Sequence, residues 1–321
     1  MRYSRRELGK LALTALPAVT VLKQPLTAMA QSPAKPNSTI DGVDLGTITY
    51  SYRSMPDQSA EAILRYVLDS GISRIEFMGG PVEAFAGAPQ AAAGRRGQLP
   101  TPEQQAAQRV AADSLRAWRT SVSMDRFRAL RKMFNDAGVT IYAWKQLTPN
   151  MSDAEMEYVF NVAEALGCTH TTLELIDDQD QLRRIGQFAE KKKIYAAYHT
   201  HLQGSMTAFD QAFAISKGNT ANVDLGHFVA AGGDPVAFIK KFNGRISSVH
   251  LKDRTTPANG QHNLPWGTGN TPLKEILLTM RRDKHTYPAA IELEYDVPAG
   301  SDAVRETVKC LDFCKAALAN T

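Results

Sequence analysis

Short β-rich runs alternate along the chain with amphipathic helical stretches of about 15 to 20 residues. The pattern predicts eight strands, at residues 45–52, 72–79, 139–145, 170–175, 193–201, 221–226, 246–253 and 289–296. The helical patterns between them end near glycine, as helices do where the chain turns back toward the next strand. Eight such alternations in 321 residues predict an α/β fold, a (β/α)8 TIM barrel. A doubly wound open sheet is the alternative, but no glycine-rich phosphate loop follows the first strand.

The first thirty residues are predicted to be a targeting signal. MRYSRRELGK carries a twin arginine after a serine, LALTALPAVTVL is a short and moderately apolar run, and Ala28-Met29-Ala30 has the small-x-small form that signal peptidase cleaves. About 12 apolar residues are too few to cross a bilayer, so we expect no stable membrane span after processing. The sequence therefore predicts export to the periplasm by a twin-arginine-type route. Residues 31–44 are predicted to be a linker and residues 45–321 a single barrel.

One internal segment departs from the strand and helix alternation. Residues 81–108 are rich in alanine, glycine, proline and glutamine and show no clear apolar period. We expect a long loop on the active-site side of the barrel. Two interpretations remain open, namely a mobile lid over the site and an insertion with no part in turnover.

The charge balance excludes one class of function. Lys and Arg number 37 against 33 Asp and Glu, which gives a formal charge of +4, and part of this excess lies in the first ten residues. No basic surface for nucleic acid is therefore expected. The three cysteines are too few for a disulfide framework, and we interpret Cys310 and Cys314 as core residues.

Polar side chains collect at the carboxyl ends of the predicted strands, where barrel active sites form. They are Arg53, Glu76, Lys145, Glu174, His199, His201, Asp224, His227, His250, Lys252, Asp253, Glu292, Glu294 and Asp296. Carboxylates and histidines aimed at one barrel mouth repel and desolvate one another unless a cation neutralises them. The sequence thus predicts one divalent metal ion, and mixed oxygen and imidazole ligands suit Mn, Co, Zn, Mg or Fe.

Motifs in the second half of the chain resemble those of a known family. NVDLGHFVAAGGDPVAFIKKFNGRISSVHLKD, LPWGTGNTPLKEIL and IELEYD are similar to the motifs of xylose isomerase-like barrels in the sugar isomerase/epimerase superfamily, and within it to the inosose dehydratase and exported keto-sugar lyase branch. The resemblance covers roughly residues 45–317. It implies the barrel fold, a bound metal and a carbohydrate substrate.

The resemblance also implies particular metal ligands. Asp224 in VDLGH and His250 in VHLKD correspond to ligands, and His227 corresponds to a residue turned toward substrate. On the last strand Glu292 is ranked ahead of Glu294. The fourth ligand stays open between two residues, because many relatives have a glutamate where this chain has His199, and Glu174 is the nearest unassigned carboxylate.

The chemistry expected of such a site is proton abstraction next to a sugar carbonyl, with the metal as Lewis acid. The candidates for base and acid are Glu294, His201, His227, Lys252 and Glu174, and a buried lysine beside a cation can lose its proton near neutrality. The residues expected to bind substrate are Arg53, Glu76, Lys145 and Asp253.

Export favours an unphosphorylated sugar, keto-sugar or keto-glycoside as the small-molecule substrate, and elimination or hydration is favoured over simple isomerisation. Three alternatives are kept. A sugar isomerase or epimerase proper would share the metal and the proton abstraction. A non-catalytic sugar-binding barrel would keep the metal without turnover, and an endonuclease would need a basic groove that the charge balance disfavours. The oligomeric state is left open.

Overall fold

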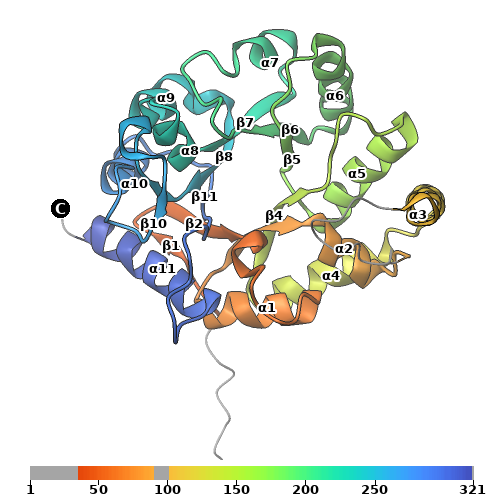
Figure 1. Cartoon of the computed structure of the whole chain (residues 1–321), viewed down its shortest axis with the longest axis horizontal. Helices are drawn as coiled ribbons and strands as arrows, with labels where there is room; N and C mark the ends of the chain where they lie inside the picture. The colour runs from red at the N-terminus through yellow and green to blue at the C-terminus, as the bar shows by residue number, and fades with distance from the viewer. Residues whose placement is uncertain (1–34, 90–100, 320–321) are drawn as a thin grey trace, which may run out of the picture. The chain divides into compact units, whose positions relative to one another are not determined.

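The computed structural model describes residues 35–89 and 101–319, and within them eight parallel strands form a closed barrel inside a ring of helices (Figure 1). The strands of the barrel are β2 (Val43–Ile48), β3 (Arg74–Met78), β4 (Thr140–Lys145), β5 (His170–Glu174), β6 (Tyr195–His199), β7 (Asn219–Asp224), β8 (Ile246–Leu251) and β11 (Ala289–Ile291). The helices are α1 (Ala60–Asp69), α2 (Gly79–Ala86), α3 (Pro102–Ser121), α4 (Asp125–Asp136), α5 (Asp153–Leu166), α6 (Gln179–Lys192), α7 (Asp210–Ile215), α8 (Leu225–Ala230), α9 (Pro235–Phe242), α10 (Leu273–Arg282) and α11 (Ala303–Ala319). The predicted TIM barrel is confirmed.

Each predicted strand overlaps an observed one, and the strands follow chain order around the barrel. The order is β2, β11, β8, β7, β6, β5, β4 and β3, and pairing of β2 with β3 closes the ring. A two-residue strand, β1 (Thr39–Ile40), pairs antiparallel with β2. The predicted linker at 31–44 is therefore wrong at its carboxyl end, because residues 39–44 form this small hairpin on the barrel.

Local sequence explains where the helices begin and end. In α5 the Ser152 side chain accepts from the backbone N–H of Glu155, and the Glu155 side chain accepts from the backbone N–H of Ser152. This reciprocal pairing satisfies two donors that a helix start leaves free. Gly167 ends α5 with φ +77°, a left-handed conformation that glycine adopts without steric cost.

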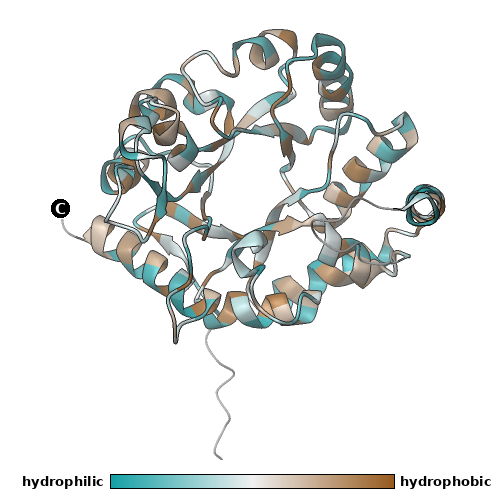
Figure 2. Ribbon diagram, in the orientation of Figure 1, coloured by the Kyte–Doolittle hydropathy of each residue, from teal (hydrophilic) through white to brown (hydrophobic). Residues whose placement is uncertain are grey.

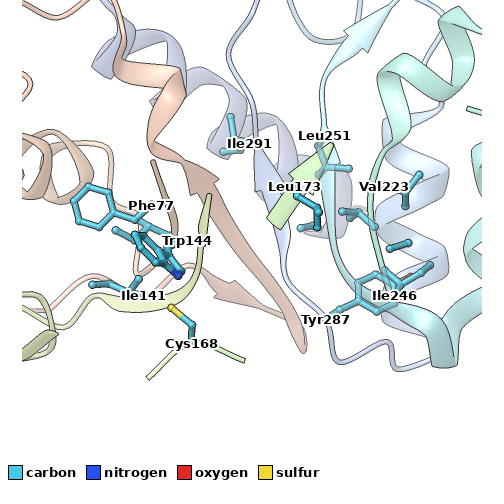
Figure 3. Packing of buried hydrophobic residues seen from close by; sticks show 14 of the residues in the cluster. Phe77, Ile141, Trp144, Cys168, Leu173, Val223, Ile246, Leu251, Tyr287 and Ile291 are labelled. Atoms are coloured by element: carbon cyan, nitrogen blue, oxygen red, sulfur yellow. The ribbon is translucent and has the colours of Figure 1, made fainter. Parts of the chain in front are cut away.

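Apolar side chains on the outer face of the barrel pack against the helices. Figure 3 shows Phe77, Ile141 and Trp144 grouped at β3 and β4, and the ring of Phe77 lies 5.2 Å from that of Phe134 in α4. The helices carry hydrophobic and hydrophilic residues in alternation along their ribbons (Figure 2), as expected when one side faces strands and the other faces water. The core thus lies mainly between strands and helices.

The long loop predicted at 81–108 is wrong at both ends. Residues 79–86 form α2, and α3 begins at Pro102 after Thr101, whose side chain accepts from the backbone N–H of Gln104 in a capping box. Residues 102–110 of α3 are all exposed, which explains why the predicted segment shows no clear apolar period, whereas Trp118 near the end of the helix packs partly buried against the core. Its last turn is nevertheless attached, because Arg119 Nε lies 2.8 Å from Glu83 Oε1.

The predicted targeting segment at 1–30 lies outside the described residues. Among the residues that the structure describes, no helix has the length and apolar character needed to cross a bilayer. Cys310 and Cys314 are buried in α11, as expected of core residues.

Polar residues fill the upper interior of the barrel. Glu76 on β3 contacts His250 on β8, and these strands are not neighbours in the sheet, so the contact crosses the interior. Alternate positions of β8 and of the segment after β11 carry His250, Lys252, Glu292 and Glu294, because side chains two residues apart in an extended chain share a face. Titratable side chains therefore gather in the interior at this end of the barrel.

Candidate metal centre

Four buried side chains from four neighbouring strand ends meet inside the barrel. Ligand atoms of His199, Asp224, His250 and Glu292 all lie within 4.8 Å of one another. We call these four residues the ligand cluster. It contains Glu292 and His199, whereas Glu174 belongs with His199 and His201 to a second group whose ligand atoms also lie within 4.8 Å of one another, so the choice of ligands stays a prediction.

Asp224 ends β7 and also caps the following helix. Its Oδ1 accepts from the backbone N–H of His227 at 2.8 Å, which fixes the carboxylate at the start of α8. Its Oδ2 is buried and has no aligned hydrogen-bond partner among the described residues, although Lys252 Nζ lies 2.8 Å away. Burial raises the pKa of Asp224, and the charge of Lys252 opposes that rise. An oxygen with an unused lone pair is suited to bind a cation.

His250 lies between two carboxylates. Its Nδ1 is 2.9 Å from Glu292 Oε2, and its Nε2 is 2.8 Å from Glu76 Oε2. Burial opposes a charge on the ring, but Glu76 and Glu292 raise the pKa of His250 to about 10. Burial alone would raise the pKa of Glu292, yet Lys252 and His250 hold it well below its ordinary value. The two residues therefore form an ion pair in the interior.

His199 presents one ring nitrogen to the cluster. Its Nδ1 lies 3.0 Å from Asn222 Oδ1, and its ring centre lies 4.8 Å from that of His250. Burial lowers the pKa of His199 to about 3, so the ring is neutral at physiological pH. A neutral imidazole is the form that binds a metal.

Lys252 supplies a positive charge at the edge of the cluster. Its ammonium lies 2.8 Å from Asp224 Oδ2, 2.9 Å from Glu292 Oε2 and 2.6 Å from Glu294 Oε2. Burial alone would lower the pKa of Lys252, but the three carboxylates raise it overall. The three carboxylates therefore favour the protonated amine, and loss of its proton beside a bound cation stays a prediction.

Gly226 makes room for the Lys252 chain. A Cβ at Gly226 would lie 2.2 Å from Lys252 Cγ and 2.7 Å from the Lys252 carbonyl oxygen. Alanine favours a helix over glycine by about 0.5–1 kcal/mol, but overpacking against a backbone atom costs about 1–3 kcal/mol. We expect Gly226→Ala to lower the free energy of unfolding in urea titrations by about 1–2 kcal/mol. Gly244→Ala is the matched control because a Cβ added at Gly244 would meet no described atom within 4 Å, and equal stability of the two variants would contradict the packing argument.

A second group of titratable residues lies at the mouth. Glu174 is 2.7 Å from Lys145 Nζ through Oε1 and 3.0 Å from His201 Nε2 through Oε2. The hydrogen bond to Glu174 raises the pKa of His201, whose side chain is about half exposed. Glu174 and Lys145 thus lie at the rim as an ion pair, with His201 above the ligand cluster.

His227 is held in one tautomer by a residue that the sequence analysis did not single out. Arg254 Nη1 donates to His227 Nδ1, so the ring proton is on Nε2, which lies 3.9 Å from Glu294 Oε2. Burial lowers the pKa of His227 to about 2. His227 is therefore a neutral hydrogen-bond donor at the mouth. The arginine directly follows VHLKD and is buried in the two-residue strand β9 (Asp253–Arg254), and its place next to that motif is the signal that could have identified it.

Two residues predicted to contact substrate have other partners. Glu76 is fully buried beneath the cluster and bonded to His250, so its position does not support a substrate contact. Asp253 Oδ2 accepts from the backbone N–H groups of Gly267, Thr268 and Gly269, and it is also buried. Asp253 therefore organises the loop that follows it.

Arg53 lies beside the segment that follows β11, and its expected contact with substrate stays a prediction. Its Nη1 donates to the carbonyl oxygen of Leu293 at 2.6 Å, and its guanidinium lies 4.4 Å from the centre of the Tyr50 ring. These contacts hold the arginine beside the segment that carries Glu292 and Glu294.

The ligand cluster fits a divalent metal ion. It offers two imidazoles and two carboxylates, a set that suits Mn, Co, Zn or Fe. The Oδ2 of Asp224, which lies 2.8 Å from the Lys252 ammonium, and the neutral His199 ring are groups that such an ion would use. The cluster suggests a metal site of unknown ion.

Comparison with known proteins identifies the family. The xylose isomerase-like TIM barrel family matches residues 106–314, and the chain belongs to this family. A shorter stretch is 32% identical over 79 residues to an inosose dehydratase of Clostridium beijerinckii, covering 23% of this chain and 26% of that protein. An inosose dehydratase of Clostridium botulinum is 36% identical over 77 residues, covering 22% and 26%. The match thus spans about a quarter of the length of these relatives.

Solved structures share the fold at low sequence identity. A sugar phosphate isomerase/epimerase from Parabacteroides distasonis aligns with TM-score 0.57 at 16% identity, covering 88% of this chain and 97% of that one. A probable 3-DHS dehydratase from Bacillus anthracis aligns with TM-score 0.56 at 14% identity, covering 86% and 98%. D-psicose 3-epimerase from Clostridium cellulolyticum aligns with TM-score 0.60 at 11% identity, covering 86% and 99%. At these identities the likeness shows the fold alone.

Proposed function

We propose that the protein is a divalent-metal-dependent enzyme that removes a proton next to the carbonyl of an unphosphorylated sugar, keto-sugar or keto-glycoside, with elimination or hydration as the net reaction. The observation that carries this proposal is the buried ligand cluster at the carboxyl ends of the strands, with acid and base groups directly above it. The family and the partial likeness to inosose dehydratases support it.

The proposal assigns His199, Asp224, His250 and Glu292 to the metal. A divalent ion held there would stabilise negative charge on substrate oxygens as a Lewis acid. Holding the substrate in one orientation over the cluster falls to the rim, and we assign that role to Arg53 and Lys145.

Glu294 is the proposed base. It follows the ligand Glu292 on the same face, its side chain is 21% exposed, and Lys252 fixes one of its oxygens at 2.6 Å. A partly exposed carboxylate beside the cluster can accept a proton from a bound sugar. Lys252 is thereby a positioning residue for Glu294 rather than a base.

His201 is the proposed acid. Glu174 raises its pKa, which keeps a proton available for an oxygen that leaves the substrate. His227, held neutral with its proton on Nε2, would donate a hydrogen bond to a substrate oxygen. A carboxylate base in Glu294 and an imidazole acid in His201 suit an elimination reaction. Epimerisation would instead need a base on each face of the sugar.

The test is to follow the reaction in deuterated water. Protein loaded with Mn²⁺ would be incubated with sugars, 3-keto-glycosides and inososes, and the products followed by NMR. We expect deuterium next to the carbonyl and loss or gain of water in one substrate class, both abolished by chelation. Aldose and ketose products would instead identify an isomerase, and binding without any exchange would identify a non-catalytic barrel.

We also propose export by a twin-arginine-type route, which is the reason for preferring an unphosphorylated substrate. The support is the SRRELGK motif and the Ala28-Met29-Ala30 site. Replacing Arg5 and Arg6 with lysine is expected to leave a folded precursor in the cytoplasm, detected by fractionation and immunoblotting. The same replacement at Arg126 and Arg128 is the control. Unchanged delivery of the Arg5 and Arg6 variant to the periplasm would exclude this route.

A further inference from the structure

Glu76 lies beneath the ligand cluster and binds three side chains that could each orient it. Its Oε1 accepts from Thr172 Oγ1 at 2.6 Å. Its Oε2 accepts from Asn222 Nδ2 at 2.8 Å and lies 2.8 Å from His250 Nε2. All four residues are fully buried. Because an ionised carboxylate only accepts hydrogen bonds, each of these partners must turn a donor toward it.

The first consequence concerns the amide of Asn222. Its NH2 group faces Glu76 and also donates to Ser248 Oγ at 2.9 Å. The oxygen of the amide therefore faces the other way, where it lies 3.0 Å from His199 Nδ1. An amide oxygen only accepts, so the proton of the His199 ring must be on Nδ1. This leaves the lone pair of His199 on Nε2, at the ligand cluster.

The second consequence concerns His250. Its Nε2 donates to Glu76, and its Nδ1 donates to Glu292 Oε2 at 2.9 Å, so the ring is an imidazolium with Nδ1 directed at the cluster. The two histidines thus present opposite ring nitrogens to the same small volume. A metal at the cluster would displace the Nδ1 proton of His250, while Glu76 holds the proton on Nε2.

We propose that Glu76 is the positioning residue of the metal centre, holding the Nε2 proton of His250 directly and fixing the ring proton of His199 through Asn222. The inference rests on the proposed metal site for its purpose, but the hydrogen-bond chain stands on the geometry alone. A single buried carboxylate that orders two ligands differs from a buried countercharge, which would need no particular tautomer. Carboxylates that hold metal-binding histidines in this way usually contribute 10–100-fold to metal affinity.

The test compares ring nitrogens by 15N NMR in metal-free protein and then measures Zn²⁺ affinity by calorimetry. We expect His199 of the native chain to carry its proton on Nδ1, and Nε2 of His250 to keep its proton after Zn²⁺ is added. In Glu76→Gln the new amide can donate or accept, so Asn222 can rotate. His199 should then lose its single tautomer, and Zn²⁺ affinity should fall by roughly 10–100-fold.

Two further variants test separate hydrogen bonds in the series from Glu76 to His199. Thr172→Val removes the partner of Oε1 but leaves both Oε2 contacts, so it is the matched control and should keep the tautomer and most of the affinity. Asn222→Leu interrupts the path to His199 while Glu76 still faces His250, so it should release His199 alone. This variant also serves if Glu76→Gln does not fold.

The outcomes separate the inference from the proposed function. A native His199 protonated on Nε2, or displacement of the His250 Nε2 proton by Zn²⁺, would overturn the inference. So would Glu76→Gln with an unchanged tautomer and affinity. The native protein could bind no Zn²⁺ while His199 still carries its proton on Nδ1 and loses this single tautomer in Asn222→Leu. That result would contradict the proposed metal centre but would support the hydrogen-bond series from Glu76 through Asn222 to His199.

Discussion

Replacing Asp224 with asparagine or His250 with alanine should remove the bound metal and the activity together. Asp224→Asn replaces the carboxylate with an amide, so the proposed metal ligand Oδ2, which has no aligned hydrogen-bond donor among the described residues, is lost. The amide oxygen can still accept from the backbone N–H of His227 and cap α8. His250→Ala removes an imidazole ligand and leaves Glu76 and Glu292 without their shared partner. We expect one divalent ion per native chain and less than about a tenth of that in each variant by elemental analysis, since losing one ligand weakens a site strongly.

The controls use the same exchanges away from the cluster. Asp234 caps α9 through the backbone N–H of Ala237, and Asp234→Asn keeps that function. His262 is exposed, and His262→Ala leaves the interior unchanged. Both should retain metal and activity. Stoichiometric metal in both Asp224→Asn and His250→Ala would show that the cluster is not the metal site.

Glu294→Gln should keep the metal and slow turnover by on the order of 10²-fold or more, which is the usual scale for a positioned proton-transfer group. Glu294 lies outside the ligand cluster, so metal content should not depend on its charge. The variant loses the carboxylate proposed to accept the proton, while its amide oxygen can still face Lys252.

Metal content and deuterium exchange should be measured on the same preparation of this variant. Glu275→Gln, on the exposed surface of α10, is the matched control and should turn over normally. Full activity of Glu294→Gln on the identified substrate would transfer the role of base to Glu174, since the geometry holds Lys252 protonated.

The fold could be predicted because every barrel strand repeats one simple pattern. Each strand is short and apolar on its outer face, and several of the following helices start at a capping residue such as Ser59 or Ser152. The first half of helix α3 was missed because residues 102–110 are all exposed. Apolar periodicity reports burial against a core, so an exposed helical segment does not show it.

The candidate site could be predicted in part, since strand ends converge by topology. The sequence cannot show which neighbours share a contact across the barrel, so Glu76 was assigned to substrate although it lies beneath His250. The charge argument for a metal was also incomplete. Lys252 and a protonated His250 already offset two of the four carboxylates Glu76, Asp224, Glu292 and Glu294, so the metal rests on ligand geometry and family rather than on charge repulsion alone.

The ion pairs around Lys252 bear on the order in which the protein folds and acquires its metal. In small zinc domains the free energy of metal binding is the free energy of folding, so the chain stays unfolded until the metal arrives. Here an ammonium and an imidazolium from the chain itself lie among Glu76, Asp224, Glu292 and Glu294, so covalent parts of the protein already offset half of this negative charge. Biogenesis can therefore run in two stages, with a finished barrel first and metal supply afterwards. The cell can then regulate activity through the availability of the ion without changing the amount of folded protein.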